Sequence, residues 1–88
     1  MAGTLLYLLR RPPDEALRRV LEAHAAQGRE VRLLLCQDAV AWAGAPPGIA
    51  AAHVREDAER RGTAGAGQPL GWGEALEWIH QADVAIVW

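Results

Sequence analysis

Apolar residues gather in four short runs that are separated by polar, glycine-rich or proline-rich segments. The runs cover residues 4–9, 31–36, 49–54 and 84–88. Each run has the length of an ordinary strand. The second is apolar on both faces apart from one Arg, which is typical of a strand buried inside a parallel sheet with helices on both sides. The pattern therefore predicts four strands at the centre of the fold.

Two of the intervening segments carry strong helix signals. Residues 13–27 begin with Pro13 and two acidic residues, and they place a stripe at helical spacing that would face a sheet: Leu17, Val20, Leu21 and His24. Residues 72–81 form a second amphipathic pattern, with Trp72, Leu76 and Ile79 on one side. Both segments are predicted to be helices.

Shorter elements are predicted elsewhere. Asp38 is a suitable N-cap for a short helix over residues 39–44, and another short helix is expected over residues 55–61. Residues 63–71 are predicted to be a loop. The glycines in and just before this loop do not indicate a phosphate-binding loop, because they follow a helix rather than a strand and the chain has no Lys.

The alternation of strands and helices predicts an α/β fold. Short connections favour a small parallel sheet of about four strands in a three-layer α/β/α arrangement, built from residues 1–88 as a single domain. The first, second and last strands are expected to be parallel neighbours. The carboxyl ends of parallel strands lie at one edge, so a common rim is expected from the residues there: Arg10, Arg11, Cys36, Gln37, Asp38, Arg55 and Trp88.

Composition narrows the possible partners. The net charge of −2 argues against direct nucleic-acid binding, and no apolar run is long enough to span a membrane. One cysteine excludes an internal disulfide and fits a reducing cytoplasm, and no signal peptide is visible. A hydrophobic content of 51% with four Trp favours an oligomer, with one or more of Trp42, Trp72 and Trp78 at an interface.

Three stretches resemble one known family. Residues 34–40 (LLCQDAV), residues 54–62 (VREDAERRG) and residues 82–88 (ADVAIVW) are similar, in order and spacing, to the TusB/DsrH-like branch of the DsrE/DsrF/DsrH-like sulfur-relay proteins. The resemblance implies strand order 3-2-1-4 and a cytoplasmic subunit of a sulfur-relay complex. Such complexes support 2-thiolation of the tRNA wobble uridine or, in other lineages, sulfur oxidation. The implied partners are DsrE/TusD-like and DsrF/TusC-like subunits.

The resemblance also separates this chain from the sulfur carriers of the family. Their persulfide-carrying cysteine follows the third strand, where this chain has Arg55, Glu56 and Asp57. Cys36 is the only sulfur that could serve instead. A cysteine that ends an apolar strand is usually buried, and the neighbouring Asp38 carboxylate disfavours a thiolate. Cys36 is therefore expected to be structural.

The sequence leaves three hypotheses about function open. The favoured one is a non-catalytic subunit of a sulfur-relay complex. The alternatives are a persulfide-carrying sulfurtransferase that uses Cys36, and a self-associating protein of the same fold outside the pathway. Arg10, Arg11 and Arg55 could bind an anion or a partner, or could pair with neighbouring carboxylates. The His residues lack metal-ligand spacing, so neither a metal site nor a cofactor is predicted.

Overall fold

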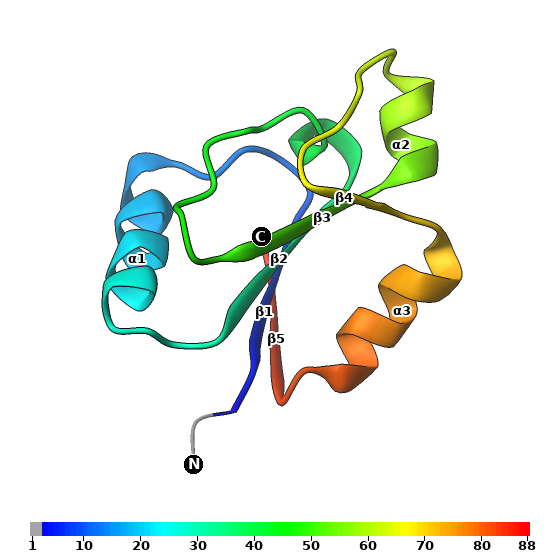
Figure 1. Ribbon diagram of the computed structural model, residues 1–88. Coiled ribbons are helices and arrows are strands. Elements are labelled where there is room, and N and C mark those ends of the chain that lie inside the picture. Colours follow the sequence, from blue (N-terminus) through cyan, green and yellow to red (C-terminus); the bar gives the residue numbers. More distant parts are fainter. Residues whose placement is uncertain (1–2) are drawn as a thin grey trace.

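A computed structural model describes residues 3–88, and its five strands and three α-helices form an α/β structure (Figure 1). The elements are β1 (Leu5–Leu9), α1 (Glu15–Ala26), β2 (Val31–Leu35), the 3₁₀ turn η1 (Gln37–Ala39), β3 (Ala50–Val54), α2 (Arg55–Arg60), β4 (Gln68–Leu70), α3 (Trp72–Gln81) and β5 (Val84–Val87). Among these residues no helix is long and apolar enough to cross a membrane.

The five strands form one parallel sheet in the order β4-β3-β2-β1-β5. Leu5 of β1 lies opposite Val31 of β2 on one side and opposite Val84 of β5 on the other. The four strands expected from the sequence are confirmed, including their order 3-2-1-4. The sheet has one strand more than expected, because residues 68–70 pair with β3 at the edge opposite β5. The prediction that residues 63–71 form only a loop is wrong.

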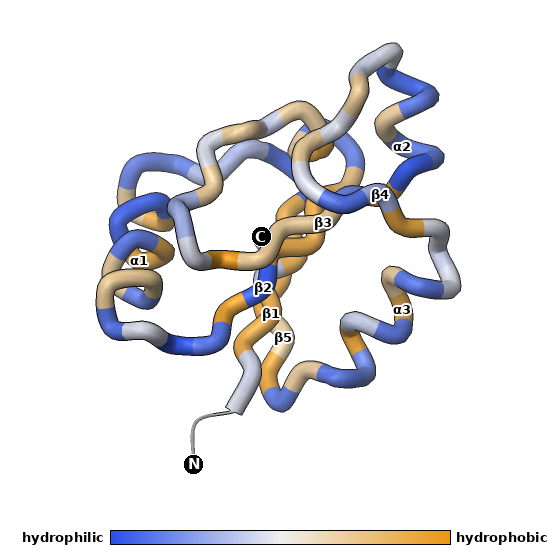
Figure 2. The backbone as a smooth tube through the Cα atoms, in the orientation of Figure 1, coloured by the Kyte–Doolittle hydropathy of each residue, from blue (hydrophilic) through white to orange (hydrophobic). Residues whose placement is uncertain are grey.

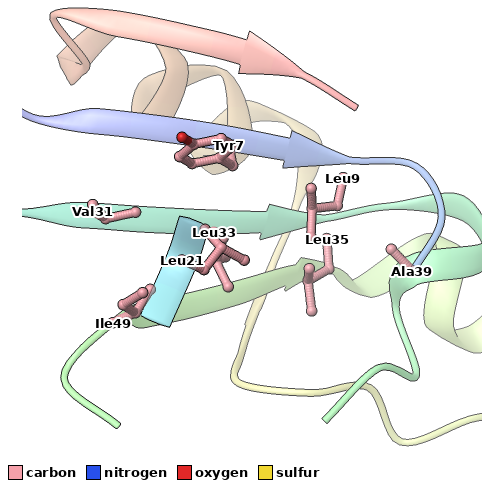
Figure 3. Packing of buried hydrophobic residues seen from close by; sticks show 8 residues of the cluster. All are labelled: Tyr7, Leu9, Leu21, Val31, Leu33, Leu35, Ala39 and Ile49. Carbon is pink, nitrogen blue, oxygen red and sulfur yellow. The ribbon is translucent and has the colours of Figure 1, made fainter. Parts of the chain in front are cut away.

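The sheet lies between two helices that cover opposite faces (Figure 1). On the face of α1, Leu21 is fully buried against β2 and β3, and Figure 3 shows it beside Leu33. On the face of α3, Ala75 is buried, and Trp78 and Ile79 pack against the second core cluster. Figure 2 shows that hydrophobic residues are concentrated along β1, β2 and β5. The three-layer arrangement follows from the two apolar faces of β1 and β2, which lie inside the sheet.

Each of the two long helices leaves part of its expected apolar stripe exposed. Trp72 and Leu76 were expected to share a side with Ile79, yet they are 47% and 53% exposed. Val20 of α1 is also exposed, whereas Leu17 packs towards the sheet. Helix α1 begins after Asp14, whose side-chain oxygen accepts a hydrogen bond from the Leu17 backbone at 2.8 Å. Each helix thus buries a narrower stripe than its apolar residues suggested.

The short helix expected over residues 39–44 is wrong. The chain makes only the 3₁₀ turn η1, in which Cys36 holds the N-cap position and Asp38 lies inside the turn. Ala39 and Val40 are fully buried, so the chain continues over the core. The Pro46-Pro47 pair that follows favours extended backbone. Trp42 is therefore in a loop, packed against the α1-side cluster.

Two glycines allow β4 to reach the sheet. Gly65 and Gly67 have φ of 79° and 71°, which is the left-handed region that most residues avoid. A Cβ atom at Gly65 would collide with the ring of His53, and one at Gly67 would collide with the carbonyl of Ala51. Glycine is therefore needed at both positions because the loop passes close to β3. This close packing accounts for the repeated glycines of the loop without a nucleotide.

Candidate functional site

A rim of polar side chains lies at the carboxyl ends of three adjacent strands. The cavity there has a volume of about 300 Å³, and its lining residues come from the ends of β1, β2 and β5: Arg10, Arg11, Gln37, Asp38 and Trp88. The sheet order explains this grouping, because β2, β1 and β5 are neighbours and their ends meet. Five of the residues expected at a common rim are thus brought together.

Arg55 also lies at the carboxyl edge of the sheet, as expected, but it does not line this cavity. It begins α2 after β3, which is separated from β1 by β2. Its Nε lies 3.9 Å from Oε1 of Glu59, one helical turn further along the exposed side of α2. We call the cavity the rim pocket, and its lining residues are Arg10, Arg11, Gln37, Asp38 and Trp88.

The two arginines of the rim pocket are held by Trp88. The Arg10 backbone and its Nε both donate hydrogen bonds to the Trp88 carbonyl, at 3.2 and 3.3 Å. The Arg11 guanidinium lies 5.1 Å from the centre of a Trp88 ring, a cation–π distance. Within residues 3–88 neither arginine forms an ion pair. The expected neighbours are engaged elsewhere, since Asp14 caps α1 and Glu15 pairs with Arg19.

The other side of the rim pocket is fixed by a buried carboxylate that the sequence did not reveal. Gln37 has a φ of 49°, unusual for a residue with a side chain, and its backbone N–H donates to Oδ2 of Asp57 at 2.8 Å. Asp57 is buried in α2, and its other oxygen lies 3.7 Å from Arg60. Asp57 thereby joins α2 to η1. Nothing in the charged segment REDAER distinguishes Asp57 from its neighbours in the sequence.

Cys36 lies behind the rim pocket and is closed off from solvent. It is 4% exposed, packs in the α3-side cluster, and its Sγ is 3.5 Å from the Leu9 carbonyl. Burial raises the pKa of the thiol, and the charge of Asp57 raises it further. Arg10 and Arg61 oppose this shift. The sequence pointed to Asp38 as the relevant carboxylate, but the source of the effect is Asp57, because Asp38 is exposed and paired with Arg61 at 3.2 Å.

We expect the Cys36 thiol of the folded protein to react with an aromatic disulfide reagent at least about 100-fold more slowly than in urea, because the reagent reaches it only when the structure opens. The rate should keep rising into alkaline pH, since the raised pKa delays thiolate formation. Absorbance of the released thiol between about pH 6.5 and 9.5 measures both effects. A fast reaction at the acidic end would contradict this picture of a sealed thiol.

The described residues offer little that could hold a metal ion. No group of three or more His, Cys, Asp or Glu side chains gathers at one point within residues 3–88. His24 instead lies with its Nε2 3.2 Å from the Tyr7 hydroxyl, and His53 is buried with its Nδ1 2.7 Å from the Ala66 carbonyl. Both histidines therefore serve packing and local hydrogen bonding.

The rim pocket contains groups that are suited to binding an anion. Two guanidinium groups without ion pairs favour an anionic group, such as a carboxylate on a partner, and the nearest nucleophile is a protonated, enclosed thiol. Comparison with known proteins gives no match to a family model, to a curated protein or to a solved structure.

Proposed function

We propose that this protein is a non-catalytic subunit of a cytoplasmic sulfur-relay complex that supports 2-thiolation of the tRNA wobble uridine. The proposal takes its pathway from the resemblance of three sequence stretches to the TusB/DsrH-like branch. The observation that carries the non-catalytic role is the enclosure of Cys36, which is 4% exposed and has a raised pKa. A sulfur carrier needs an accessible thiolate.

The residues after β3 support the same assignment. In the sulfur carriers of the family this junction holds the working cysteine, whereas here Arg55 begins α2 and Asp57 is turned inwards to hold η1. The rim pocket supplies two arginines for contact with a partner. The partners that we propose are DsrE/TusD-like and DsrF/TusC-like subunits, which would carry the sulfur.

Two other functions have less support. A persulfide-carrying sulfurtransferase would require Cys36 to open to solvent during each reaction. A self-associating protein outside the pathway is favoured by exposed apolar residues such as Trp72, Leu76 and Val87. The sulfurtransferase alternative gives no role to the arginines of the rim pocket.

The test is a reconstituted relay with a cysteine desulfurase, the DsrE- and DsrF-like partners and tRNA. Cys36→Ala should support thiolation within about twofold of the wild-type rate, although lost packing should lower its stability by about 1–2 kcal/mol. Arg10→Ala combined with Arg11→Ala should weaken partner binding, measured by calorimetry. Arg18→Ala is the matched control, because Arg18 is an exposed arginine of α1 outside the rim pocket.

Loss of thiolation in a folded Cys36→Ala variant would show that the carrier function is correct. Full thiolation without this protein would place it outside the pathway. Equal binding by the double rim variant and the Arg18 control would remove the rim pocket from partner recognition.

A further inference from the structure

Strand β5 is an open edge of the sheet. Among residues 3–88 its only strand neighbour is β1, and all four of its residues are exposed. Val84, Ile86 and Val87 have exposed fractions of 50%, 38% and 60%. Strands of parallel sheets are normally covered on both faces, so a strand this apolar and this exposed is unusual.

The exposure affects both faces of the strand. The register places Val84 beside Leu5 and Val87 beside Leu8, and these partners pack in the α1-side and α3-side clusters respectively. Ile86 shares the α1 face with Val84, because alternate residues of a strand point the same way. Neither long helix covers β5, since all four of its residues are exposed. The strand also lacks the charged residues and prolines that keep natural sheet edges from pairing.

The backbone of β5 has free hydrogen-bonding groups on its outer side. Val84 donates to the Thr4 carbonyl, while Trp88 donates to the Leu8 carbonyl and accepts from Arg10, so the backbone groups of these two residues face β1. In a parallel pair the facing residues alternate along the strand. The N–H and C=O groups of Ala85 and Val87 therefore point away from the sheet.

We propose that a second copy of this chain pairs with β5 in antiparallel orientation, which joins two sheets into one of ten strands. A two-fold axis at Ile86 places Ala85 of each copy opposite Val87 of the other, so that the free N–H and C=O groups of both residues are satisfied. The strand is uncharged, so it meets its own copy without like-charge repulsion. The inference does not depend on the sulfur-relay function.

Charge at the two ends of β5 favours this orientation. Asp83 precedes the strand at one end, and Arg10 and Arg11 lie beside Trp88 at the other. An antiparallel copy brings each Asp83 towards the two arginines of its partner. One Asp83 oxygen accepts from the Thr4 backbone at 2.7 Å, which fixes the carboxylate near the strand. A parallel copy would instead place like charges at the same end.

A cavity extends the contact beyond the four residues of β5. It has a volume of about 520 Å³ at the amino end of the strand, where its walls include Leu5, Arg29 and Val84. Val84 lies opposite Trp88 of the other copy in the proposed register, and both side chains are on the α1 face. The aromatic side chain at the end of each strand thus lies beside the cavity of its partner.

The test is sedimentation equilibrium over about 1 to 300 µM, which spans the micromolar dissociation constants of small interfaces. The wild-type chain should pass from monomer to dimer in this range. Val87→Pro should stay monomeric, because proline removes an outward N–H and is tolerated on the solvent side of an edge strand. Val87→Lys should also stay monomeric. Val20→Lys, which changes an exposed valine of α1 in the same way, should dimerise like the wild type.

A variant that removes the Asp83 charge and the hydrogen exchange of two backbone amides test the dimer independently. Asp83→Asn keeps an acceptor for Thr4 but should weaken the dimer by about 2- to 30-fold, as expected for the loss of two exposed ion pairs. The amide protons of Ala85 and Val87 should gain protection from exchange as concentration rises. If Val87→Pro does not fold, Val87→Lys and these amides decide the question.

Three results would overturn the proposal. The first is a monomer throughout the concentration range, including one that binds only a different protein through β5. The second is a dimer that is unchanged by both Val87 variants, because another surface would then hold it. The third is a dimer in which the Ala85 and Val87 amides exchange as fast as in the monomer.

Discussion

Replacing Gly67 with Ala is expected to lower the free energy of unfolding by about 2–5 kcal/mol. Gly67 has a φ of 71°, which costs a residue with a Cβ about 1–2 kcal/mol. The new methyl group would also collide with the Ala51 carbonyl, part of the β3 backbone, and such overpacking costs about 1–3 kcal/mol. Because β4 begins at the next residue, the variant should lose the pairing of β4 with β3. Urea denaturation followed by circular dichroism measures the change.

Two other glycines separate these causes. Gly28 has a φ of 69° but open space around its Cβ position, so Gly28→Ala should show only the conformational cost of about 1–2 kcal/mol. Gly73 lies inside α3 with nothing near its Cβ position, and Gly73→Ala should stabilise the protein by up to about 1 kcal/mol. Equal losses at Gly67 and Gly28 would mean that the close approach of the loop to β3 contributes nothing.

Replacing Asp57 with Ala is expected to cost about 2–3 kcal/mol and to lower the pKa of Cys36. The variant leaves the Gln37 N–H without its charged acceptor in a turn with positive φ. It also removes one of the two causes that raise the thiol pKa. A raised pKa gives stability that is full below the pKa of the unfolded thiol and is lost as pH rises through the folded value. In the variant this alkaline loss should be smaller and should be complete at a lower pH, because the folded pKa lies closer to the unfolded one.

Asp57→Asn and Asp38→Ala are the controls. Asp57→Asn retains an oxygen for Gln37, so it should lose less stability while lowering the Cys36 pKa in the same direction. Asp38 is exposed, and Asp38→Ala should change stability by under about 1 kcal/mol. Titration of the thiol by ultraviolet absorbance measures the pKa in each variant. A shift in Asp38→Ala as large as in Asp57→Ala would restore Asp38 as the controlling carboxylate.

The central strands could be predicted because burial on both faces of the sheet requires a continuous run of apolar residues. Val31–Leu35 lies in the middle of the sheet, where both faces are covered, and its continuous apolar run reports that burial. Gln68–Leu70 could not be found in this way. It is a three-residue edge strand with two exposed residues and a proline, and it forms because glycines bring it against β3.

The candidate site could be predicted only as far as parallel topology fixes it. The rule that carboxyl ends meet placed Arg10, Gln37 and Trp88 together without any knowledge of side chains. It also placed Arg55 at this edge, but the rule does not give the distance along the edge, and Arg55 lies outside the rim pocket. Asp57 was missed because its burial depends on how α2 packs against η1, which is a tertiary contact between segments 20 residues apart.

The position of β1 between β2 and β5 also affects how the chain folds. β1 and β2 are joined by one helical crossover, whereas Asp83 meets Thr4 across a separation of 79 residues. Contacts this distant in sequence form slowly, because closing a long loop costs entropy before any stabilising contact is made. We therefore expect β1, β2 and β3 to assemble first. Until residues 84–87 arrive, β1 is a temporary edge, and this intermediate is the state in which the nascent chain most needs protection from aggregation.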